Sequence, residues 1–435
     1  MRPPLPPGPF LVVGLARSGQ AAMRLLAERG EDVAGADAGT PAVDLPGVEV
    51  RLADDGVELL SECAARTLVK SPGVPNEAPV VIAARERGIE VVGELELAWR
   101  LLPNRFVAVT GTNGKTTTVE LLGAIWRAAG LSVAVAGNVG TPLASLVGRL
   151  DPATTVICEA SSFQLEDSSA FAPEVAVMLN LEEDHLDRHG DLASYRAAKE
   201  RIFANQRPED WAIAPPELVP VGAGSWVGFG DGTDADVEDG WIGFRGRRLL
   251  RVDELRIRGA HNLDNALAAT AAALAGGDVP PTAVAHALRS FRGVEHRLEE
   301  VATIDGVLYV NDSKATNPAS ALRGLQAFED GVHAILGGSL KGGGFEALRG
   351  EAHARCRACY LVGEAADRLA ADLGGAAPLV RSGTLEQAVA DATAAADPGD
   401  VVLLSPACAS FDAFADYEQR GARFKEIVAA LEQGE

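Results

Sequence analysis

Short apolar runs alternate with helical stretches along the whole chain. Near-continuous apolar runs occupy Phe10–Val13, Val133–Ala136, Thr155–Cys158, Val175–Leu179 and Val401–Leu404. Each run ends in glycine or polar residues, and most are followed by apolar residues at helical spacing. Buried strands separated by helices are typical of parallel sheets. The pattern predicts an α/β fold whose sites lie at the carboxyl ends of the strands.

The alternation falls into three blocks, which we predict to be domains 1–103, 104–293 and 294–435. The first block opens as a doubly wound sheet does, with strand Phe10–Val13, turn Gly14–Gly19 and a helix from Gln20 to Arg29. The third block repeats the order of strand, loop and helix. We therefore expect each block to have its own sheet.

The stretch Val107–Thr118 is an apolar strand that runs into a glycine-bearing turn and opens a helix. Gly111 and Gly114 allow a tight turn whose N–H groups converge, and the helix adds its positive dipole end. Lys115 can reach phosphate oxygens and the Thr116 hydroxyl can bind Mg²⁺. The general phosphate-loop pattern has glycine where this chain has Val109. The alternative is a strand-to-helix turn without nucleotide, but the order of these features favours a phosphate site.

Two turns of the first block are candidates for a second anion site. Gly14–Gly19 approximates G-x-G-x-x-G with Ala16 at the middle glycine, and Asp37 stands near the ribose-reading acidic position. The turn has two interpretations, a nucleotide or diphosphate site and simple packing of helix on strand. Ser71–Gly73 forms another turn at a strand end. Two turns at one edge favour the nucleotide interpretation.

Three side chains of the central block are candidates for catalysis. Glu159 ends an apolar strand, as a Mg²⁺-holding carboxylate often does, although a solvated cap has the same pattern. His185 stands in the polar cluster Glu182–His189, where a surface histidine is an equal alternative. Lys199 shares a predicted buried helical stripe with Leu192, Tyr195, Ile202 and Phe203. It either snorkels outward along its methylenes or stays buried, where desolvation lowers its pKa and frees a neutral amine.

Later polar residues extend the candidate set. Asn262 and Asn265 share one helix face, where asparagine costs about half a kcal/mol each, so a ligand contact is a plausible reason for them. A second anionic pocket is predicted from Lys314, Lys341, Ser410 and Arg420.

Composition excludes several classes of protein. The chain has 435 residues, 47% of them hydrophobic and 23% charged, with a net charge of −22 that argues against general nucleic-acid or anionic-membrane binding. No apolar run reaches membrane-spanning length, and the proline-rich N-terminus does not resemble a signal peptide. Five scattered cysteines fit a reducing compartment. The pair Cys356 and Cys359 is read as buried or incidental thiols, with a redox or zinc site as the alternative. We expect a soluble cytoplasmic protein.

Ordered motifs along nearly the whole chain resemble the Mur ligase superfamily. They are Gly111–Thr117, Gly137–Gly140, Glu159–Glu166, Glu183–Arg188, Tyr195–Lys199, His261–Asn262 with Asn265, His296–Arg297, Asn311–Asn317 and Ser405–Ser410. Within the superfamily, Ser161–Glu166 and Ser405–Ser410 with Tyr417–Gly421 look like the member that adds D-glutamate to UDP-N-acetylmuramoyl-L-alanine (UDP-MurNAc-L-Ala). The resemblance implies three domains: a Rossmann-like N-terminal domain for the UDP substrate, a central P-loop ATPase domain with a mostly parallel sheet, and a Rossmann-like C-terminal domain for the amino acid.

The resemblance also implies a reaction and its cofactors. ATP phosphorylates the substrate carboxylate, the D-glutamate amine attacks the acyl phosphate, and phosphate leaves, in cytoplasmic peptidoglycan precursor synthesis. Two Mg²⁺ ions take part, and Lys199 matches a lysine that is carbamylated by CO₂ in this family. That match agrees with the buried interpretation of Lys199, because only a neutral amine captures CO₂. We expect a monomer with no nucleic-acid or membrane partner.

Matching the motifs residue by residue assigns the following roles. The catalytic residues are Lys115, Glu159, His185 and Lys199, and the metal site consists of Thr116, Glu159, His185 and Lys199. ATP is assigned to Gly111, Thr112, Asn113, Gly114, Lys115, Thr116, Thr117, Asn262, Asn265, Arg297 and Asp312. The UDP substrate is assigned to Leu15, Ala16, Arg17, Ser18, Asp37, Ser71, Pro72, Gly73 and Asn138. D-Glutamate is assigned to Lys314, Thr316, Lys341, Ser410, Phe411 and Tyr417.

The chain departs from the family pattern at two places. Ala38-Gly39 stands where some members carry Thr-Arg against uracil, and the positions of Phe411 and Tyr417 are substituted relative to some relatives. The alternatives are a Mur-type ligase for another amino acid or L-glutamate, an enzyme like folylpolyglutamate synthase, and a nucleotide-binding switch without ligase activity. The Ser405–Ser410 motif argues against the ligase alternatives, and Lys199 on an apolar face argues against the switch.

Overall fold

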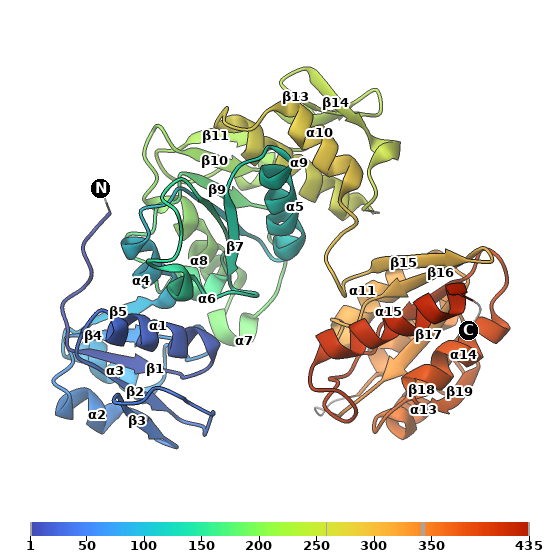
Figure 1. Ribbon diagram of the computed structural model, residues 1–435, viewed down its shortest axis with the longest axis horizontal. Helices are drawn as coiled ribbons and strands as arrows, with labels where there is room; N and C mark the ends of the chain where they lie inside the picture. The colour runs from blue at the N-terminus through green and yellow to red at the C-terminus, as the bar shows by residue number, and fades with distance from the viewer. Residues whose placement is uncertain (1, 258, 341–343, 434–435) are drawn as a thin grey trace. The chain divides into compact units, whose positions relative to one another are not determined.

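The computed structural model describes residues 2–257, 259–340 and 344–433 (Figure 1). It is a mixed α/β structure, as the alternation of apolar runs predicts. The chain separates into two compact units, Met1–Phe291 and Arg292–Glu435. The first unit contains two parallel sheets and a small antiparallel sheet, and the second contains one six-stranded sheet. The three domain boundaries stay predictions; residue 103 lies between the last helix of the first sheet and the first strand of the second.

The N-terminal sheet has five parallel strands in the order β3-β2-β1-β4-β5. They are β1 (Phe10–Val13), β2 (Val33–Asp37), β3 (Glu49–Leu52), β4 (Thr67–Lys70) and β5 (Glu90–Gly93), with helices α1 (Arg17–Glu28), α2 (Val57–Glu62), α3 (Pro79–Glu86) and α4 (Glu94–Leu101). This is the Rossmann order. The chain reverses its direction of winding between β1 and β4, so the turns after these strands, Gly14–Gly19 and Ser71–Gly73, face each other. Helix α1 begins three residues before the predicted Gln20.

The central sheet has six parallel strands in the order β11-β10-β9-β6-β8-β7. They are β6 (Phe106–Thr110), β7 (Val133–Gly137), β8 (Thr155–Glu159), β9 (Val175–Met178), β10 (Trp211–Ala214) and β11 (Ser225–Gly228). Its helices are α5 (Lys115–Ala128), α6 (Ser162–Glu166), α7 (Leu186–His189), α8 (Leu192–Ala204), α9 (Ala260–Ala275) and α10 (Pro281–Ser290). Because β6 lies between β8 and β9, the loop after β6 meets the ends of both neighbours.

Alternation along β6 divides the central core in two. Val107 and Val109 pack with α5, α9 and α10 on one face, and Phe106 and Ala108 pack with α4 and α8 on the other. Figure 1 shows α5, α9 and α10 together beside the central sheet. A small antiparallel sheet, β12 (Ala235–Glu238), β13 (Trp241–Phe244) and β14 (Arg247–Arg251), follows β11. Helices on both faces of the sheet leave its carboxyl edge as the place for a site.

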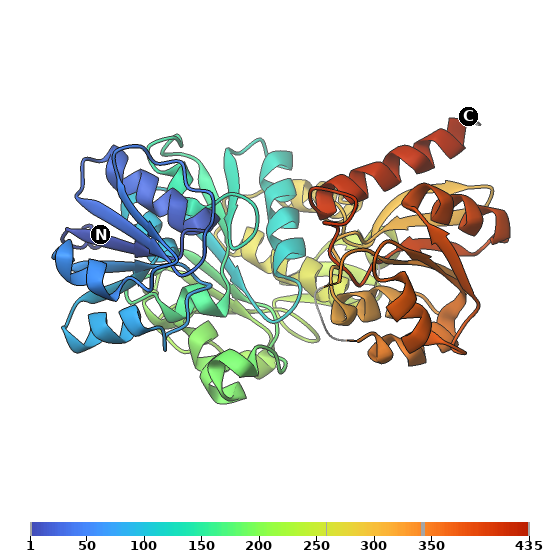
Figure 2. The ribbon, with the colours of Figure 1, turned by 90° about the horizontal axis from the view of Figure 1, so that it is seen from below.

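The C-terminal unit has the strand order β15-β16-β20-β17-β18-β19, parallel except for β15 against β16. Its strands are β15 (Glu299–Ile304), β16 (Val307–Asn311), β17 (Val332–Gly337), β18 (Cys356–Val362), β19 (Leu379–Gly383) and β20 (Val401–Leu404). Its helices are α11 (Pro318–Gln326), α12 (Arg349–Arg355), α13 (Ala366–Leu373), α14 (Leu385–Ala395) and α15 (Tyr417–Gln433). Figure 2 shows this orange sheet between helices, and a separate apolar cluster fills each side.

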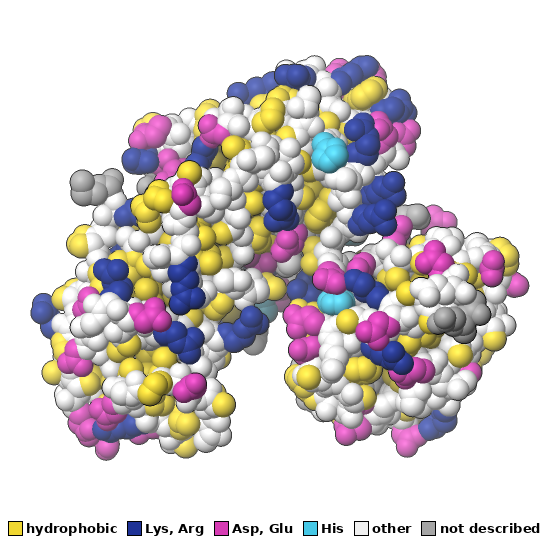
Figure 3. Space-filling model, in the orientation of Figure 1, with side chains coloured by type: hydrophobic (Ala, Val, Ile, Leu, Met, Phe, Trp, Pro, Cys, Tyr) yellow, Lys and Arg dark blue, Asp and Glu magenta, His cyan; other side chains and the backbone are white. Residues whose placement is uncertain are grey.

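Charged side chains of both signs are mixed over the face seen in Figure 3. Many form exposed pairs, such as Arg289 with Glu254 at 2.7 Å. Such pairs contribute about 0–1 kcal/mol each. Within the described residues, no helix is both long and apolar enough to cross a membrane.

A buried ion pair ties the first two sheets together. Lys70, the last residue of β4, lies 2.8 Å from Asp167, just after α6, and both side chains are buried. Burial lowers the pKa of Lys70 and raises the pKa of Asp167, while each partner opposes the shift of the other. The pair therefore fixes how the two sheets join, but the cost of removing both charges from water offsets much of their attraction.

We expect Lys70→Met to lower the free energy of unfolding by about 3–5 kcal/mol, because it leaves the Asp167 carboxylate buried without its counter-charge. The double variant Lys70→Met/Asp167→Leu is expected to recover much of that loss. Urea unfolding measures both values. Arg289→Gln, which breaks an exposed pair, is the control and should change stability by less than about 1 kcal/mol. Equal losses in the buried and exposed variants would contradict the prediction.

Candidate active site

The loop after β6 has the form of a phosphate cradle. Helix α5 begins at Lys115, its N-cap Gly114 has a φ of 83°, and no side chain caps the first backbone N–H groups. The Lys115 Nζ donates to the carbonyl oxygens of Gly111 at 2.9 Å and Thr112 at 3.0 Å. An uncapped helix start beside a lysine fits an anion, since the dipole and the N–H groups point to it. The prediction of a strand, turn and helix here is confirmed.

Helix α9 closes over this loop. A Cβ added at Gly114 would lie 2.1 Å from the Asn265 Oδ1, so the close approach requires glycine. Asn265 is buried and its Nδ2 donates to the Asn262 Oδ1 at 3.2 Å. The two asparagines predicted to share one helix face therefore interact and lie against the cradle.

Glu159 is the last residue of β8 and is buried. The Thr116 Oγ1 donates to one of its carboxylate oxygens at 2.9 Å, and the Asn138 Nδ2 donates to the other at 3.0 Å. The solvated-cap alternative is therefore wrong. Hydroxyl and carboxylate oxygens are donors that Mg²⁺ accepts, so Thr116 and Glu159 fit the ion.

Lys199 is only 1% exposed, so the snorkelling alternative is wrong. Its Nζ donates to the Gly111 carbonyl at 2.7 Å, the same oxygen that Lys115 contacts, and lies 4.5 Å from the centre of the Tyr195 ring. Burial, and then the charge of Lys115, lower the pKa of Lys199 to about 7. With this pKa, the Lys199 amine is neutral in about half of the protein molecules at pH 7. Leu192, by contrast, is 38% exposed, because the buried stripe starts only at Tyr195.

This pKa gives a testable pH dependence. The neutral amine is the form that adds CO₂, and its fraction falls as the pH drops below about 7. We expect the carbamate carbon of Lys199, followed by NMR with ¹³C-bicarbonate, to lose occupancy by at least about tenfold per pH unit below about pH 6, because acid protonates the amine and also opposes the release of the proton that carbamate formation sets free. An ordinary lysine would lose its neutral form already below about pH 10. Carbamate formation with that ordinary midpoint would contradict the prediction.

His185 has a φ of 52° and is exposed. Its ring lies 5.0 Å from the ring of Phe163 and 6.5 Å from that of Tyr195, and its Nε2 lies 3.6 Å from Asp184. The histidine is therefore exposed, as one interpretation had it, and it lies beside the helix that carries Lys199. Its metal role stays a prediction.

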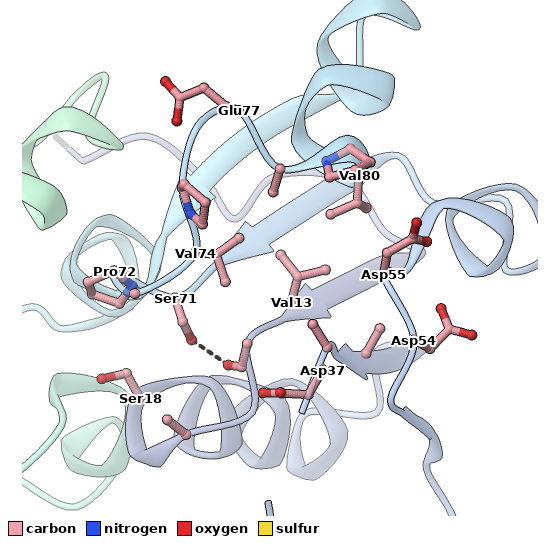
Figure 4. Close-up of a pocket in the computed structure, with 18 of the residues that line it drawn as sticks. Val13, Ser18, Asp37, Asp54, Asp55, Ser71, Pro72, Val74, Glu77 and Val80 are labelled. Atoms are coloured by element: carbon pink, nitrogen blue, oxygen red, sulfur yellow. Dashed lines mark hydrogen bonds between the residues drawn. The ribbon is translucent and has the colours of Figure 1, made fainter. Parts of the chain in front are cut away.

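A cavity of about 830 Å³ opens where the N-terminal sheet reverses (Figure 4). Its floor includes Val13, Val74 and Val80, and Asp54 and Asp55 stand at one end. The residues predicted for the UDP substrate that line it are Ala16, Arg17, Ser18, Asp37, Ser71, Pro72, Gly73 and Asn138. Leu15 is the exception, because its side chain is buried in the core.

The structure confirms the packing interpretation of the Gly14–Gly19 turn, whereas the nucleotide interpretation stays a prediction. A Cβ at Gly19 would lie 1.9 Å from the Gly14 carbonyl oxygen, so the turn packs helix on strand. The same turn lines the cavity. Asp37 accepts from the backbone N–H of Leu15 at 2.5 Å and of Gly39 at 2.7 Å, so it holds the turn while facing the cavity. Ala38 also lines the cavity; it stands at the first of the two positions where the resemblance gives Thr-Arg in some family members.

A second group of predicted residues gathers in the C-terminal unit. Asp312 is buried and accepts from the Ser405 Oγ at 2.7 Å, and burial raises its pKa to about 7. Arg297 is exposed, and its charge acts on Asp312. The Lys314 Nζ lies 5.7 Å from the centre of the Tyr417 ring, so these two predicted residues are neighbours.

The loops after β17 and β20 also meet. The Ser339 N–H donates to the Ala409 carbonyl at 3.0 Å, and a Cβ at Gly338 would lie 2.1 Å from that oxygen. Ser410 is buried, Phe411 is 69% exposed and Thr316 is half-buried. Lys341 lies outside the described residues.

Arg420 does not line an anionic pocket as predicted. It is buried, and it donates to the Ser313 side chain and carbonyl and to the carbonyls of Cys408 and Ala409. Burial lowers its pKa to about 10. Its donors are taken up in bracing the Ser405–Ser410 loop against the end of β16. Sequence could not reveal this, because the contacts of Arg420 with Ser313 join residues that are 107 positions apart.

Two residues that support the cradle were not predicted for it. The Asn180 Oδ1 accepts from the Asn113 backbone N–H at 2.8 Å, and the Tyr195 hydroxyl donates to the Thr112 Oγ1 at 3.3 Å. Position was the available signal, because Asn180 follows the end of β9 and Tyr195 is one turn from Lys199.

Neither the cysteines nor any group of acidic side chains adds a further metal or redox site among the described residues. Among the described residues all five cysteines are free thiols, and Cys359 is buried, in agreement with the incidental interpretation. In the same part of the chain, no three His, Cys, Asp or Glu side chains are grouped to hold a metal. The metal set predicted here uses a hydroxyl, one carboxylate, one imidazole and a modified lysine instead.

The parallel sheets and the loop between β6 and α5 together define the class of this protein, an α/β protein with a phosphate-binding type of loop. Residues 109–219 match the Mur ligase middle domain, and residues 296–408 match the Mur ligase glutamate ligase domain. Two relatives named UDP-N-acetylmuramoylalanine–D-glutamate ligase, from Pelotomaculum thermopropionicum and Pseudomonas fluorescens Pf-5, are each 43% identical to it; the first covers 98% of both chains, the second 97% of this chain and 98% of its own. The chain belongs to the Mur ligase family.

Solved structures agree on the fold. The UDP-N-acetylmuramate–alanine ligase MurC of Thermotoga maritima has a TM-score of 0.60 at 19% identity, covering 98% of this chain and 99% of its own. MurF of Acinetobacter baumannii has a TM-score of 0.59 at 19% identity, covering 97% and 93%. At these identities the likeness concerns the fold alone.

Proposed function

We propose that this chain is an ATP-dependent ligase that joins D-glutamate to UDP-MurNAc-L-Ala in peptidoglycan precursor synthesis. The observation that carries the proposal is the arrangement around Gly111, where Lys115 and the buried Lys199 share one carbonyl next to the Thr116–Glu159 pair. Relatives aligned over 98% of the chain that bear the name of this ligase support the choice of substrates.

The chemistry requires activation of a carboxylate, whose oxygen is a poor leaving group. Transfer of the terminal phosphoryl group of ATP to that oxygen gives an acyl phosphate and ADP. The cradle N–H groups and Lys115 would bind the phosphates and offset the charge that develops on them. The D-glutamate amine then attacks the carbonyl carbon, loses a proton, and inorganic phosphate leaves with the electron pair of the C–O bond.

Mg²⁺ would be held by Thr116 and Glu159, with His185 and a CO₂-derived carbamate on Lys199 at a second ion. When bound, the two ions neutralise phosphate charge and hold its oxygens in place. Asn138 is hydrogen-bonded to Glu159 and lines the cavity, so it would connect the proposed metal position with the UDP substrate. Asn262, Asn265, Arg297 and Asp312 would contact ATP, and Lys314, Thr316, Lys341, Ser410, Phe411 and Tyr417 would receive D-glutamate.

Three coarser expectations belong to the same proposal. The chain would act as a monomer in the cytoplasm, where ATP and nucleotide-linked sugars are available. Its boundaries would fall at 1–103, 104–293 and 294–435. Analytical ultracentrifugation at assay concentrations tests the first expectation.

The test of the function is phosphate release from ATP with Mg²⁺ and UDP-MurNAc-L-Ala, comparing D-glutamate, L-glutamate and no amino acid. Release that requires both the UDP substrate and D-glutamate is expected. Release with L-glutamate instead would keep the family and change the specificity. Release that is independent of any amino acid would favour the nucleotide switch and overturn the ligase.

A further inference from the structure

The backbone carbonyl of Val74 connects the UDP cavity with the phosphate-cradle side of the first unit. Val74 lines the cavity, and its side chain points into it in Figure 4. Its carbonyl oxygen accepts from the Lys70 Nζ at 2.9 Å and from the Arg188 Nη2 at 3.2 Å. The first donor is the last residue of β4, directly before this loop, but the second comes from α7, which follows His185. Arg188 thus reaches across from the central sheet to the cavity wall.

The same guanidinium also contacts α6. Its carbon lies 4.8 Å from the centre of the Phe163 ring, and its Nη2 lies 3.5 Å from the Glu166 Oε2. The side chain is only 13% exposed, so these contacts are sheltered from solvent. Helix α6 begins three residues after Glu159. One side chain therefore contacts the cavity wall and the helix that leads from the proposed metal carboxylate.

The segment that carries Arg188 is fixed to Phe163 by two more side chains. The His189 ring stacks on Phe163 at 5.5 Å with an interplanar angle of 20°, and its Nε2 lies 3.0 Å from the Ser162 Oγ. The His185 ring lies 5.0 Å from the same phenylalanine. A continuous set of contacts therefore joins the Val74 loop to Arg188, and through Phe163 to the histidine proposed at the second Mg²⁺.

We propose that Arg188 is a positioning residue that couples the two ligands of the first unit: occupancy of the UDP cavity and binding of Mg²⁺-ATP each strengthen the other through the Val74–Arg188–Phe163 contacts. Coupling of this kind is reciprocal, and it typically changes the affinity for each ligand by about 5–150-fold. Arg188 is well suited to it, because a planar guanidinium can donate to a carbonyl, pair with a carboxylate and stack on a ring at once. The proposal rests on the proposed function, since it takes its two ligands from there.

The charges around Arg188 agree with a relay rather than a second binding site. Glu166 faces it directly, and Lys70 with its partner Asp167 lies behind the same loop. Lys70 and Arg188 both donate to the Val74 carbonyl oxygen, so this oxygen keeps one donor when either side chain is removed. Arg188→Gln is therefore expected to change the communication between the ligands more than the fold.

The experiment measures the dissociation constant of UDP-MurNAc-L-Ala by calorimetry, with and without a non-hydrolysable ATP analogue and Mg²⁺. For the unmodified protein we expect the analogue to tighten binding by at least about fivefold. In Arg188→Gln this ratio should fall to within about twofold of one, while the constant measured without analogue changes less. Arg188→Lys, which keeps the charge but cannot make all three contacts, should fall between them and covers the case in which the glutamine variant folds poorly.

Arg201→Gln is the matched control. Arg201 is exposed and donates to the Glu166 and Ser168 carbonyls at 2.8 and 2.9 Å, so it touches the same segment without reaching Val74. It should retain the full ratio. Retention of the full ratio in both Arg188 variants, or a ratio of one in the unmodified protein that binds both ligands, would overturn the inference and leave the proposed function standing. Failure of the unmodified protein to bind the UDP substrate would overturn the function, and the inference with it.

Discussion

Lys199→Ala is expected to lower D-glutamate-dependent phosphate release by at least about 100-fold, an effect typical of losing a buried electrostatic or metal-orienting group at an active site. The amine is buried against the Gly111 carbonyl, and its pKa of about 7 leaves it free to add CO₂. Added bicarbonate should not restore the alanine variant, because no amine remains to be modified.

A structural loss is separated from a chemical one by two further variants. Lys199→Met keeps the buried stem and should be as inactive as the alanine variant while unfolding at nearly the wild-type urea concentration. Arg196→Ala, on the exposed side of the same helix, removes only the pair with Glu200 and should keep activity within about twofold. Full activity of Lys199→Met would remove the carbamate from the proposal and leave the ligase reaction in place.

Lys115→Met is expected to lower phosphate release by on the order of 10³-fold, since the Lys115 amine lies in the phosphate cradle, within hydrogen-bond distance of the Gly111 and Thr112 carbonyls. Binding of the ATP analogue should weaken, whereas binding of UDP-MurNAc-L-Ala alone should stay near normal because its cavity belongs to the N-terminal sheet. Removing this charge also removes a cause of the low pKa of Lys199. The midpoint of carbamate formation should therefore move to higher pH.

The control for this variant is Arg127→Met in the last turn of α5, which removes a cation from the same helix far from the cradle. It should keep nearly full activity. A Lys115→Met enzyme that retains more than about a tenth of wild-type activity would show that the cradle N–H groups suffice, and would remove Lys115 from the catalytic set.

Local pattern predicted the elements well where the strands are short and apolar. The strand before the cradle, the helix that follows it and the strand that ends in Glu159 all form near their predicted bounds, because full burial selects near-continuous apolar residues. Boundaries moved by a few residues where a turn enters a helix, as at Arg17. The helix stripe was wrong only at its exposed first member, Leu192.

Sites whose residues lie close together in the sequence were predicted better than sites whose residues come from distant segments. Gly111–Thr117 carries its own geometry in one stretch, so sequence was enough to mark it. Arg420 was assigned to an anionic pocket although its donors are taken by Ser313, Cys408 and Ala409. Asn180 and Tyr195 support the cradle from separate elements, and the only signals in the sequence were their positions after β9 and one turn from Lys199.

By itself the sequence determined the α/β class, the phosphate loop and the stripe that carries Lys199, since each depends on spacing along one strand or helix. The tertiary structure alone decided which alternatives hold: that Lys199 is buried against Gly111, that Glu159 joins Thr116 to Asn138, and that Arg188 meets Val74. These are contacts between elements brought together by strand order, and burial and charge there depend on neighbours distant in the chain. Periodicity along one element cannot contain that information.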